Sequence, residues 1–127
     1  MIDDGNARVD LDSLKRVHLL GIGGIGVSAV ARLLLARGIH VTGSDVRESS
    51  ITRELRKEGA SVTIGHRPEN PVGADLVVVS SAIPDNNPEL IAAQEAGLAV
   101  VHRSVVLAAM MRQRRSLGIT GTNGKGS

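Results

Sequence analysis

A glycine-rich turn near the amino terminus constrains the fold of this chain more than any other segment. Residues 21–26 read Gly-Ile-Gly-Gly-Ile-Gly, directly after a largely apolar run and directly before an apolar-periodic stretch over 27–37. This order predicts a strand, a tight turn and a helix, which together form a phosphate-binding unit. We expect Gly21 to allow the sharp bend, Gly23 to let a pyrophosphate approach the backbone, and Gly26 to let the helix pack closely on its strand.

An acidic residue stands where such a unit needs one for a nucleotide. Asp45 follows the turn by about 20 residues and comes directly after a predicted strand over 40–44. Its carboxylate is expected to accept a hydrogen bond from a ribose hydroxyl, while the helix that begins near Gly24 points its amide groups and positive dipole end at the phosphates. The alternative is that the glycines serve only tight packing. Strand, helix and Asp45 together favour a bound nucleotide diphosphate.

A second glycine-rich segment lies at the other end of the sequence. Residues 121–127 read Gly-Thr-Asn-Gly-Lys-Gly-Ser. They depart from the standard phosphate loop G-x-x-x-x-G-K-[ST], because the first glycine is missing and Gly126 follows the lysine. The chemistry still suits a triphosphate, with Lys125 for the β- and γ-phosphate oxygens and the hydroxyls of Thr122 and Ser127 as magnesium ligands. The alternative is a flexible end with one solvated lysine.

Composition limits the partners that the chain can have. The formal net charge is only +2 and the basic residues are dispersed, so no nucleic-acid partner is expected. Because Phe, Trp and Tyr are absent, a bound base would rest on aliphatic side chains and backbone. Cysteine is also absent, which excludes disulfides and thiolate metal sites. Neither a secretory signal nor a run of the ~18 apolar residues that a membrane span needs is found, so we expect a cytoplasmic protein.

The rest of the sequence alternates strand-like and helix-like segments. We expect strands over 16–20, 40–44, 61–64, 75–80, 99–102 and 116–120, and helices over 24–37, 50–58, 88–96 and 104–114. This alternation predicts an α/β fold with a Rossmann-like, doubly wound, mainly parallel sheet. The strand over 75–80 is apolar on both faces, which is typical of a strand covered by helices on each side. Gly38, Gly59 and Gly97 are expected to end helices, and Asn87 with Pro88 to begin one.

Polar residues after the predicted strands are candidate ligand contacts. Ser80 and Ser81 end the strand over 75–80, and ligands of open α/β sheets bind beyond the carboxyl ends of strands. The alternative is that their hydroxyls cap the next turn. His66 follows the strand over 61–64 and is a further candidate, against a purely structural role. Three histidines inside predicted strands are interpreted as structural, and no metal cluster is expected; they are His18, His40 and His102.

From residue 17 onward the chain resembles the amino-terminal part of the Mur ligases. The resemblance is carried by residues 18–26, 43–45, 65–66, 79–83, 87–89, 107–112 and 121–125, in this order and spacing. The last loop departs from the pattern of the alanine-adding members, which usually have histidine at the position of Asn123 and two threonines at those of Gly126 and Ser127. In this loop the chain is similar to folylpolyglutamate synthases, which are related ATP-dependent ligases.

The resemblance implies an ATP-dependent ligase that joins L-alanine to UDP-N-acetylmuramate in peptidoglycan precursor synthesis, through an acyl phosphate. It implies a Rossmann-like UDP-substrate domain over 14–115, and over 116–127 the start of a central domain that binds ATP and Mg²⁺. The polar and acidic segment 1–13 is expected to be a flexible lead-in. The implied UDP-substrate contacts are Gly21, Gly23, Gly24, Gly26, Asp45, His66, Ser80 and Ser81. The implied ATP contacts are Gly121, Thr122, Asn123, Gly124, Lys125, Gly126 and Ser127, with Lys125 catalytic and Ser127 a magnesium ligand.

Two alternatives stay open at this point. The glycine turn and Asp45 would serve an NAD(P)-binding sensor or redox domain equally well. Only the second glycine-rich loop favours a ligase over this alternative. The departure at Gly126 and Ser127 is also compatible with another amino-acid ligase of the Mur and folylpolyglutamate synthase superfamily. In either kind of ligase we expect the chain alone to be inactive, because the residues that close over the γ-phosphate would follow Ser127.

Overall fold

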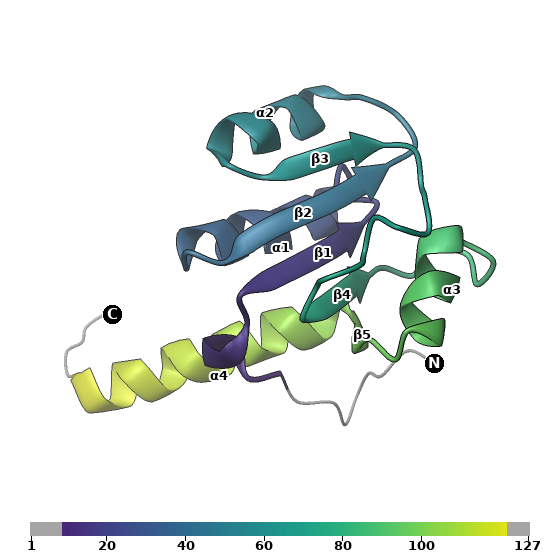
Figure 1. The fold of residues 1–127 in the computed structure, drawn as a ribbon. Coiled ribbons are helices and arrows are strands. Elements are labelled where there is room, and N and C mark those ends of the chain that lie inside the picture. The colour runs from purple at the N-terminus through teal and green to yellow at the C-terminus, as the bar shows by residue number, and fades with distance from the viewer. Residues whose placement is uncertain (1–8, 122–127) are drawn as a thin grey trace.

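A five-stranded parallel sheet carries the fold (Figure 1). The computed structural model describes residues 9–121. The strands are β1 (Arg16–Leu20), β2 (His40–Asp45), β3 (Ser61–Ile64), β4 (Leu76–Val79) and β5 (Val100–His102). They lie in the order β3-β2-β1-β4-β5, and every neighbouring pair is parallel. The predicted Rossmann-like sheet is confirmed, and its strand order reverses direction between β1 and β4.

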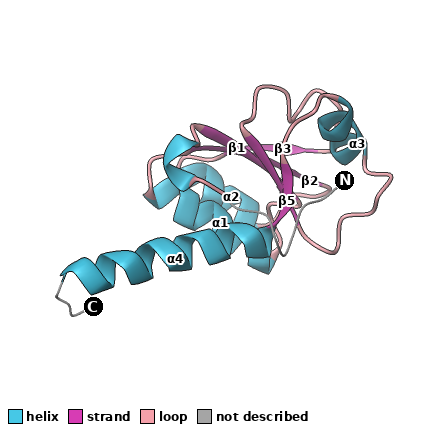
Figure 2. Ribbon diagram, turned by 90° about the horizontal axis from the view of Figure 1, so that it is seen from below, coloured by secondary structure: helices cyan, strands magenta, loops and turns pink. Residues whose placement is uncertain are grey.

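Helices cover both faces of this sheet. The helices of the described residues are α1 (Ile25–Ala36), α2 (Ser50–Glu58), α3 (Pro88–Glu95) and α4 (Arg103–Gly121). Figure 2 shows α1, α2 and α4 together on one face and α3 on the other. The chain is therefore wound on both sides of the sheet, as the alternation of strands and helices predicts.

The interior strands bury side chains on both faces. Val17 and Leu19 of β1 and Val78 of β4 pack in the cluster formed with α1, α2 and α4. Leu20 of β1 and Val79 of β4 belong to the cluster under α3. Successive strand residues point to opposite faces, so a strand between two helical layers needs apolar residues at nearly every position. The double-sided apolar character predicted for 75–80 is confirmed in β4.

Local sequence signals set the helix ends. Asn87 accepts hydrogen bonds from first-turn amides of α3, and Pro88 occupies the first turn. Ser49 and Thr52 form a reciprocal capping box at the start of α2, which the sequence analysis did not anticipate. Gly59 ends α2 in the left-handed conformation at φ 117°, as predicted.

The amino-terminal end of the described chain is better anchored than expected. Leu11–Ser13 form a 3-10 turn whose N-cap, Asp10, accepts a hydrogen bond from the Asp12 N–H. Leu11 is 2% exposed and packs in the core with α1. Burial of a leucine side chain contributes about 2 kcal/mol, which helps to offset the entropy of ordering this short turn. The prediction of a loose lead-in is therefore wrong for 9–13, and 1–8 lie outside the described residues.

The strand predicted over 116–120 is helical in the structure, because α4 continues to Gly121. A strand satisfies its backbone groups only beside a partner strand, and the described sheet ends at β3 and β5. A helix pairs the same groups within the segment. Figure 1 shows the end of α4 projecting past the sheet. Within residues 9–121, no helix is both long and apolar enough to cross a membrane.

Candidate functional site

A cleft of about 640 Å³ opens at the carboxyl ends of the strands. The glycine turn and the first turn of α1 line it, together with the residues that follow β2, β3, β4 and β5. The predicted UDP-substrate contacts on its wall are Gly21, Gly24, Gly26, Asp45, His66, Ser80 and Ser81. Gly23, the remaining one, is not among the residues that line the cleft. In open α/β sheets, ligands bind in the crevice where the strand order reverses, which here is between β1 and β4.

The first half of the glycine turn uses its amide groups internally. Gly21 bends the chain at φ 69°. The N–H groups of Gly21 and Ile22 donate to the Ser44 carbonyl oxygen at 2.8 and 3.0 Å, and the Gly24 N–H donates to the Gly21 carbonyl oxygen at 2.9 Å. These bonds hold the turn against the end of β2. The donors available to a ligand therefore come from the residues after Gly24.

The first turn of α1 supplies those donors. Among the described residues, the N–H groups of Ile25, Gly26 and Val27 have no hydrogen-bond acceptor, as expected at the start of a helix. All three residues line the cleft. Free amides and the positive end of the helix dipole favour an anion at this position.

Asp45 is tied to the glycine turn rather than standing free. Its Oδ2 accepts a hydrogen bond from the Gly23 N–H at 2.8 Å, and its Oδ1 accepts one from the Val46 N–H at 2.7 Å. A Cβ atom on Gly23 would lie 2.8 Å from Asp45 Oδ2. Gly23 thus makes room for this carboxylate, whereas we expected room for a pyrophosphate. A carboxylate has further lone pairs, so Asp45 can still accept from a ribose hydroxyl.

Arg103 is the cleft residue that the sequence analysis missed. It is the first residue of α4, and its side chain crosses Gly26 so closely that a Cβ atom there would lie 2.7 Å from Arg103 Nε. We expected Gly26 to face its own strand, but its nearest neighbour is this guanidinium. A planar, permanently charged group beside free amides suits a phosphate. One signal was present: the predicted strand over 99–102 ends next to Arg103, at the same edge of the sheet as the glycine turn.

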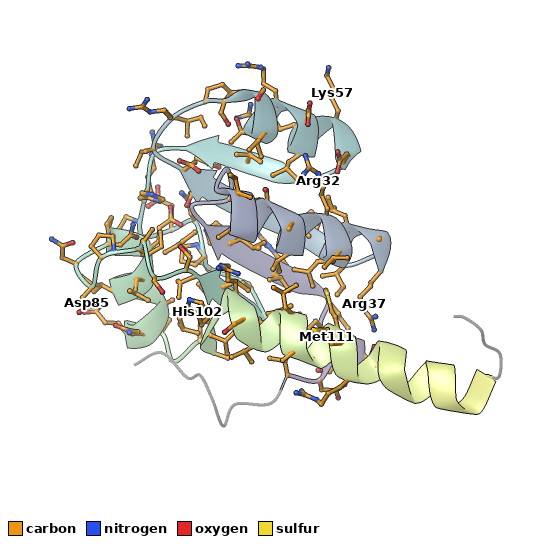
Figure 3. All side chains as sticks on the ribbon, turned by 180° about the vertical axis from the view of Figure 1, so that it is seen from behind. Arg32, Arg37, Lys57, Asp85, His102 and Met111 are labelled. Atoms are coloured by element: carbon orange, nitrogen blue, oxygen red, sulfur yellow. The ribbon has the colours of Figure 1, made fainter. Side chains whose placement is uncertain are left out.

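The two serines after β4 have structural partners as well as a place on the cleft. Ser80 Oγ accepts a hydrogen bond from the Ala82 N–H at 3.3 Å, as the capping alternative predicted. Ser81 Oγ lies 3.2 Å from Nε2 of His102, the last residue of β5. Figure 3 labels His102 beside the start of α4. Because the Ser104 N–H donates to His102 Nδ1, a neutral His102 carries its proton on Nε2 and donates it to Ser81. The Ser81 hydroxyl proton then remains available to a ligand.

A buried carboxylate lies beneath the cleft. Glu89 of α3 is fully buried. Its donors are His18 Nε2 at 2.7 Å, Ser44 Oγ at 2.7 Å, the Arg67 N–H at 2.9 Å and Asn70 Nδ2 at 2.6 Å. Burial raises the pKa of Glu89, but the hydrogen bonds from His18, Asn70, Ser44 and Arg67 outweigh it and lower the pKa to about 2. Glu89 is therefore ionised at neutral pH.

His18 and His66 lie on either side of this carboxylate. His18 is 1% exposed, and its Nδ1 lies 2.8 Å from Thr42 Oγ1, so its predicted structural role is confirmed. His66 Nδ1 lies 2.9 Å from Ser44 Oγ, and the ring lines the cleft. The sequence analysis weighed His66 as a ligand contact but gave no sign of the network beneath it.

The predicted ATP loop lies outside the described residues except for its first glycine. Gly121 is the last residue of α4, and Thr122, Asn123, Gly124, Lys125, Gly126 and Ser127 lie outside the described residues. Within residues 9–121, no group of three or more His, Cys, Asp or Glu side chains could hold a metal ion. The assignment of 116–127 to a second domain stays a prediction.

The sheet, the glycine turn and the position of the cleft define a Rossmann-like α/β domain. The model of the Mur ligase family catalytic domain matches residues 16–115, and the chain belongs to this family. The chain is 53% identical over 117 residues to the UDP-N-acetylmuramate–L-alanine ligase of Renibacterium salmoninarum, which covers 92% of this chain and 25% of the relative. It is 48% identical over 117 residues to the ligase of the same name from Thermobifida fusca, with the same two coverages, 92% and 25%.

A solved structure agrees with these relatives. The UDP-N-acetylmuramate–alanine ligase of Thermotoga maritima is similar with a TM-score of 0.74 and 34% sequence identity, over 79% of this chain and 23% of that one. The chain thus spans about a quarter of the length of the relatives that it matches.

Proposed function

We propose that this chain is the UDP-N-acetylmuramate-binding part of an ATP-dependent ligase that adds L-alanine in peptidoglycan precursor synthesis. The observation that carries the proposal is that the family match and the cleft lie in the same segment. Residues 16–115 match the Mur ligase family, and they contain a cleft where free amides of α1 and the Arg103 guanidinium converge. The names of the similar ligases supply the substrate.

In this proposal the diphosphate binds at the start of α1. The N–H groups of Ile25, Gly26 and Val27 donate to phosphate oxygens, and Arg103 adds a charged donor beside them. The ribose lies toward Asp45, which accepts from a hydroxyl. Ile25 is 85% exposed and Val46 is 68% exposed, and both line the cleft. Their side chains provide the aliphatic surface on which a base rests in a chain without aromatic residues.

The chemical step belongs to the segment after α4. The lactyl carboxylate of the substrate attacks the γ-phosphorus of ATP and releases ADP, and the amine of L-alanine then displaces phosphate from the acyl phosphate to form the amide. Lys125 stabilises charge on the transferring phosphoryl group, with Mg²⁺ held by hydroxyls that include Ser127. These roles rest on the sequence resemblance alone. The cleft holds the UDP-sugar so that its carboxylate can reach this loop.

The NAD(P)-binding alternative has less support. In dinucleotide-binding domains the acidic residue after the second strand binds the ribose, and Asp45 would serve a UDP ribose in the same way, so this residue does not separate the two ligands. The family match covers the whole nucleotide-binding unit.

A melting experiment separates the two ligands. With UDP-N-acetylmuramate at ~100 times its dissociation constant, the fold should gain ~2.7 kcal/mol, a rise in melting temperature of roughly 8 °C for a domain of this size. The melt is followed by far-ultraviolet circular dichroism, because the chain has no Trp or Tyr. We expect no comparable rise with NAD. A rise with NAD and none with the UDP-sugar would overturn the proposal in favour of the dinucleotide domain.

A further inference from the structure

We propose that Glu89 is a positioning residue that keeps the His66 ring proton on Nδ1, so that His66 presents Nε2 to the bound nucleotide as a hydrogen-bond acceptor. The identity of the nucleotide rests on the function proposed above. The position of the proton is a property of the ligand-free chain and is argued from its hydrogen bonds alone.

The groups around Glu89 all bring a proton to its carboxylate. Every polar group in contact with this fully buried carboxylate is a donor: a ring nitrogen of His18, a backbone N–H, a side-chain amide and the Ser44 hydroxyl. An ionised carboxylate can only accept. The single proton of Ser44 Oγ therefore points at Glu89 Oε1, 2.7 Å away.

The position of the His66 proton follows from that of Ser44. Ser44 Oγ lies 2.9 Å from His66 Nδ1, and with its own proton committed to Glu89 it can only accept there. His66 Nδ1 must then carry the proton that makes this bond. Glu89 Oε2 lies 3.5 Å from the same nitrogen, and its negative charge favours a proton at that place. The carboxylate thus acts on His66 both through Ser44 and directly.

The other ring nitrogen faces the cleft. Among residues 9–113, whose side chains the structure describes, Arg16 Nε is the only buried side-chain polar atom without a partner. His66 Nε2 makes no hydrogen bond to the described residues either, so it must be accessible, and the residue lines the cleft. In a neutral ring with the proton on Nδ1, Nε2 is a bare lone pair.

A bare nitrogen at this end of the cleft selects the orientation of the nucleotide. It accepts from a donor, such as the imide N–H of uracil or a ribose hydroxyl, and it repels phosphate oxygens. The free amides of α1 and the Arg103 guanidinium, on the wall of the same cleft, instead attract phosphate oxygens. The phosphates therefore bind at the free amides of α1, and a donor group of the ribose or the uracil binds at His66.

Nitrogen NMR of the ligand-free chain tests the assigned proton directly. The chain has 4 histidines, and the His66 signals are identified by their loss in His66→Asn. At a pH where the ring is neutral, we expect a protonated, pyrrole-type Nδ1 and an unprotonated, pyridine-type Nε2. The reverse pattern in the wild-type chain would overturn the proposal, and this result depends on no variant at residue 89.

The variant Glu89→Gln tests whether Glu89 keeps the His66 ring proton on Nδ1. Its amide can donate to Ser44 Oγ and so release the Ser44 proton toward His66 Nδ1, which moves the ring proton to Nε2. We expect the NMR pattern to invert and the affinity for UDP to fall about tenfold, as a donor now faces a donor. Glu95→Gln, on the exposed side of the same helix, should change neither. A folded Glu89→Gln chain that keeps the wild-type pattern or the wild-type UDP affinity contradicts the proposal.

Two nucleotide analogues identify the donor that Nε2 receives. Weaker binding of 3-methyluridine diphosphate than of UDP assigns the uracil imide, and weaker binding of 2′-deoxyuridine diphosphate assigns the ribose hydroxyl. If the wild-type chain binds both analogues as tightly as UDP, the acceptor role of His66 is wrong. If it does not bind UDP at all, the proposed function is wrong, while the ligand-free spectrum still decides the role of Glu89.

Discussion

Arg103 lies across Gly26, with its Nε 2.7 Å from the point where a Cβ atom on Gly26 would stand. This contact joins the first helix of the domain to the last one. It also sets a fixed positive charge beside the free amides of α1. The atoms that a Cβ on Gly26 would meet first belong to this arginine and not to the sheet.

The variant Gly26→Ala tests this contact. The new Cβ displaces the end of a flexible side chain, so we expect the free energy of unfolding to change by less than about 1 kcal/mol. The affinity for UDP should nevertheless fall about tenfold, because the guanidinium leaves the phosphate site. Calorimetric titration measures the affinity, and the same substitution in an Arg103→Ala background is the control. In that background, Gly26→Ala should lower the affinity for UDP only slightly further. Equal losses of affinity in both backgrounds would show that the two residues act independently.

Arg103→Ala should by itself weaken UDP binding by about 10- to 100-fold, which corresponds to loss of one charge-assisted contact. The melting temperature without ligand should change little, since no ion pair to Arg103 occurs within residues 9–121. Arg53→Ala removes the same charge from the exposed surface of α2 and should leave binding unchanged. Equal effects of the two variants would mean that only net charge matters.

The low pKa of Glu89 determines how the free energy of unfolding depends on pH in acid. Its pKa in the folded chain is about 2, below its ordinary value of 4.5. The stabilisation is therefore complete above pH 4.5 and is lost as the pH falls toward 2. In Glu89→Gln this loss is missing, so the free energy of unfolding should fall less steeply in that window, by up to about 1 kcal/mol per pH unit. Denaturant titrations at a series of pH values measure the slope.

The control for this slope is Glu95→Gln, which should behave like the wild-type chain. The backbone N–H groups of Lys15 and Arg16 lower the pKa of Asp75 by hydrogen bonding, but that contribution is common to all three chains. If the free energy of unfolding falls equally steeply with pH in Glu89→Gln and in the wild type, the assignment of an ionised Glu89 is contradicted.

Lys125 is testable only in a longer ligase that contains this chain. Lys125→Ala should lower turnover by at least ~10²-fold, the scale for loss of one preorganised charge-stabilising group. Binding of the UDP-sugar should stay the same, because its cleft is made by residues before α4 and by Arg103. Coupled measurement of phosphate release gives the rate, and an unchanged rate would remove the phosphate-loop assignment.

Much of the fold could be predicted because its signals are local. The glycine turn, the Asn87 cap and the αL position of Gly59 each depend on a few consecutive residues, and the structure has all three. The strand over 116–120 shows the limit of such signals. Its apolar pattern is compatible with a strand, yet without a partner strand in the described sheet the segment continues α4.

The parts of the site that were missed are contacts between distant segments. His18 was interpreted as structural, but nothing near it in the sequence identifies Glu89 as its partner. Arg103 looked like the ordinary start of a helix, and only the strand order brings it to Gly26. Local periodicity carries no information on which strand ends become neighbours, so the Glu89 network and the guanidinium at the cleft required the structure.

The most direct test of the account is a map of the UDP site on the chain itself. In a titration followed by amide proton–nitrogen correlation spectra, UDP should shift the amide signals of Ile25, Gly26 and Val27 and the Nε–H signal of Arg103 before all others. Saturation of these shifts at one common dissociation constant would support the phosphate site at α1. The account is contradicted if UDP binds and these four signals do not move. It is also contradicted if the first signals to shift belong to residues near Leu11, at the amino ends of the strands.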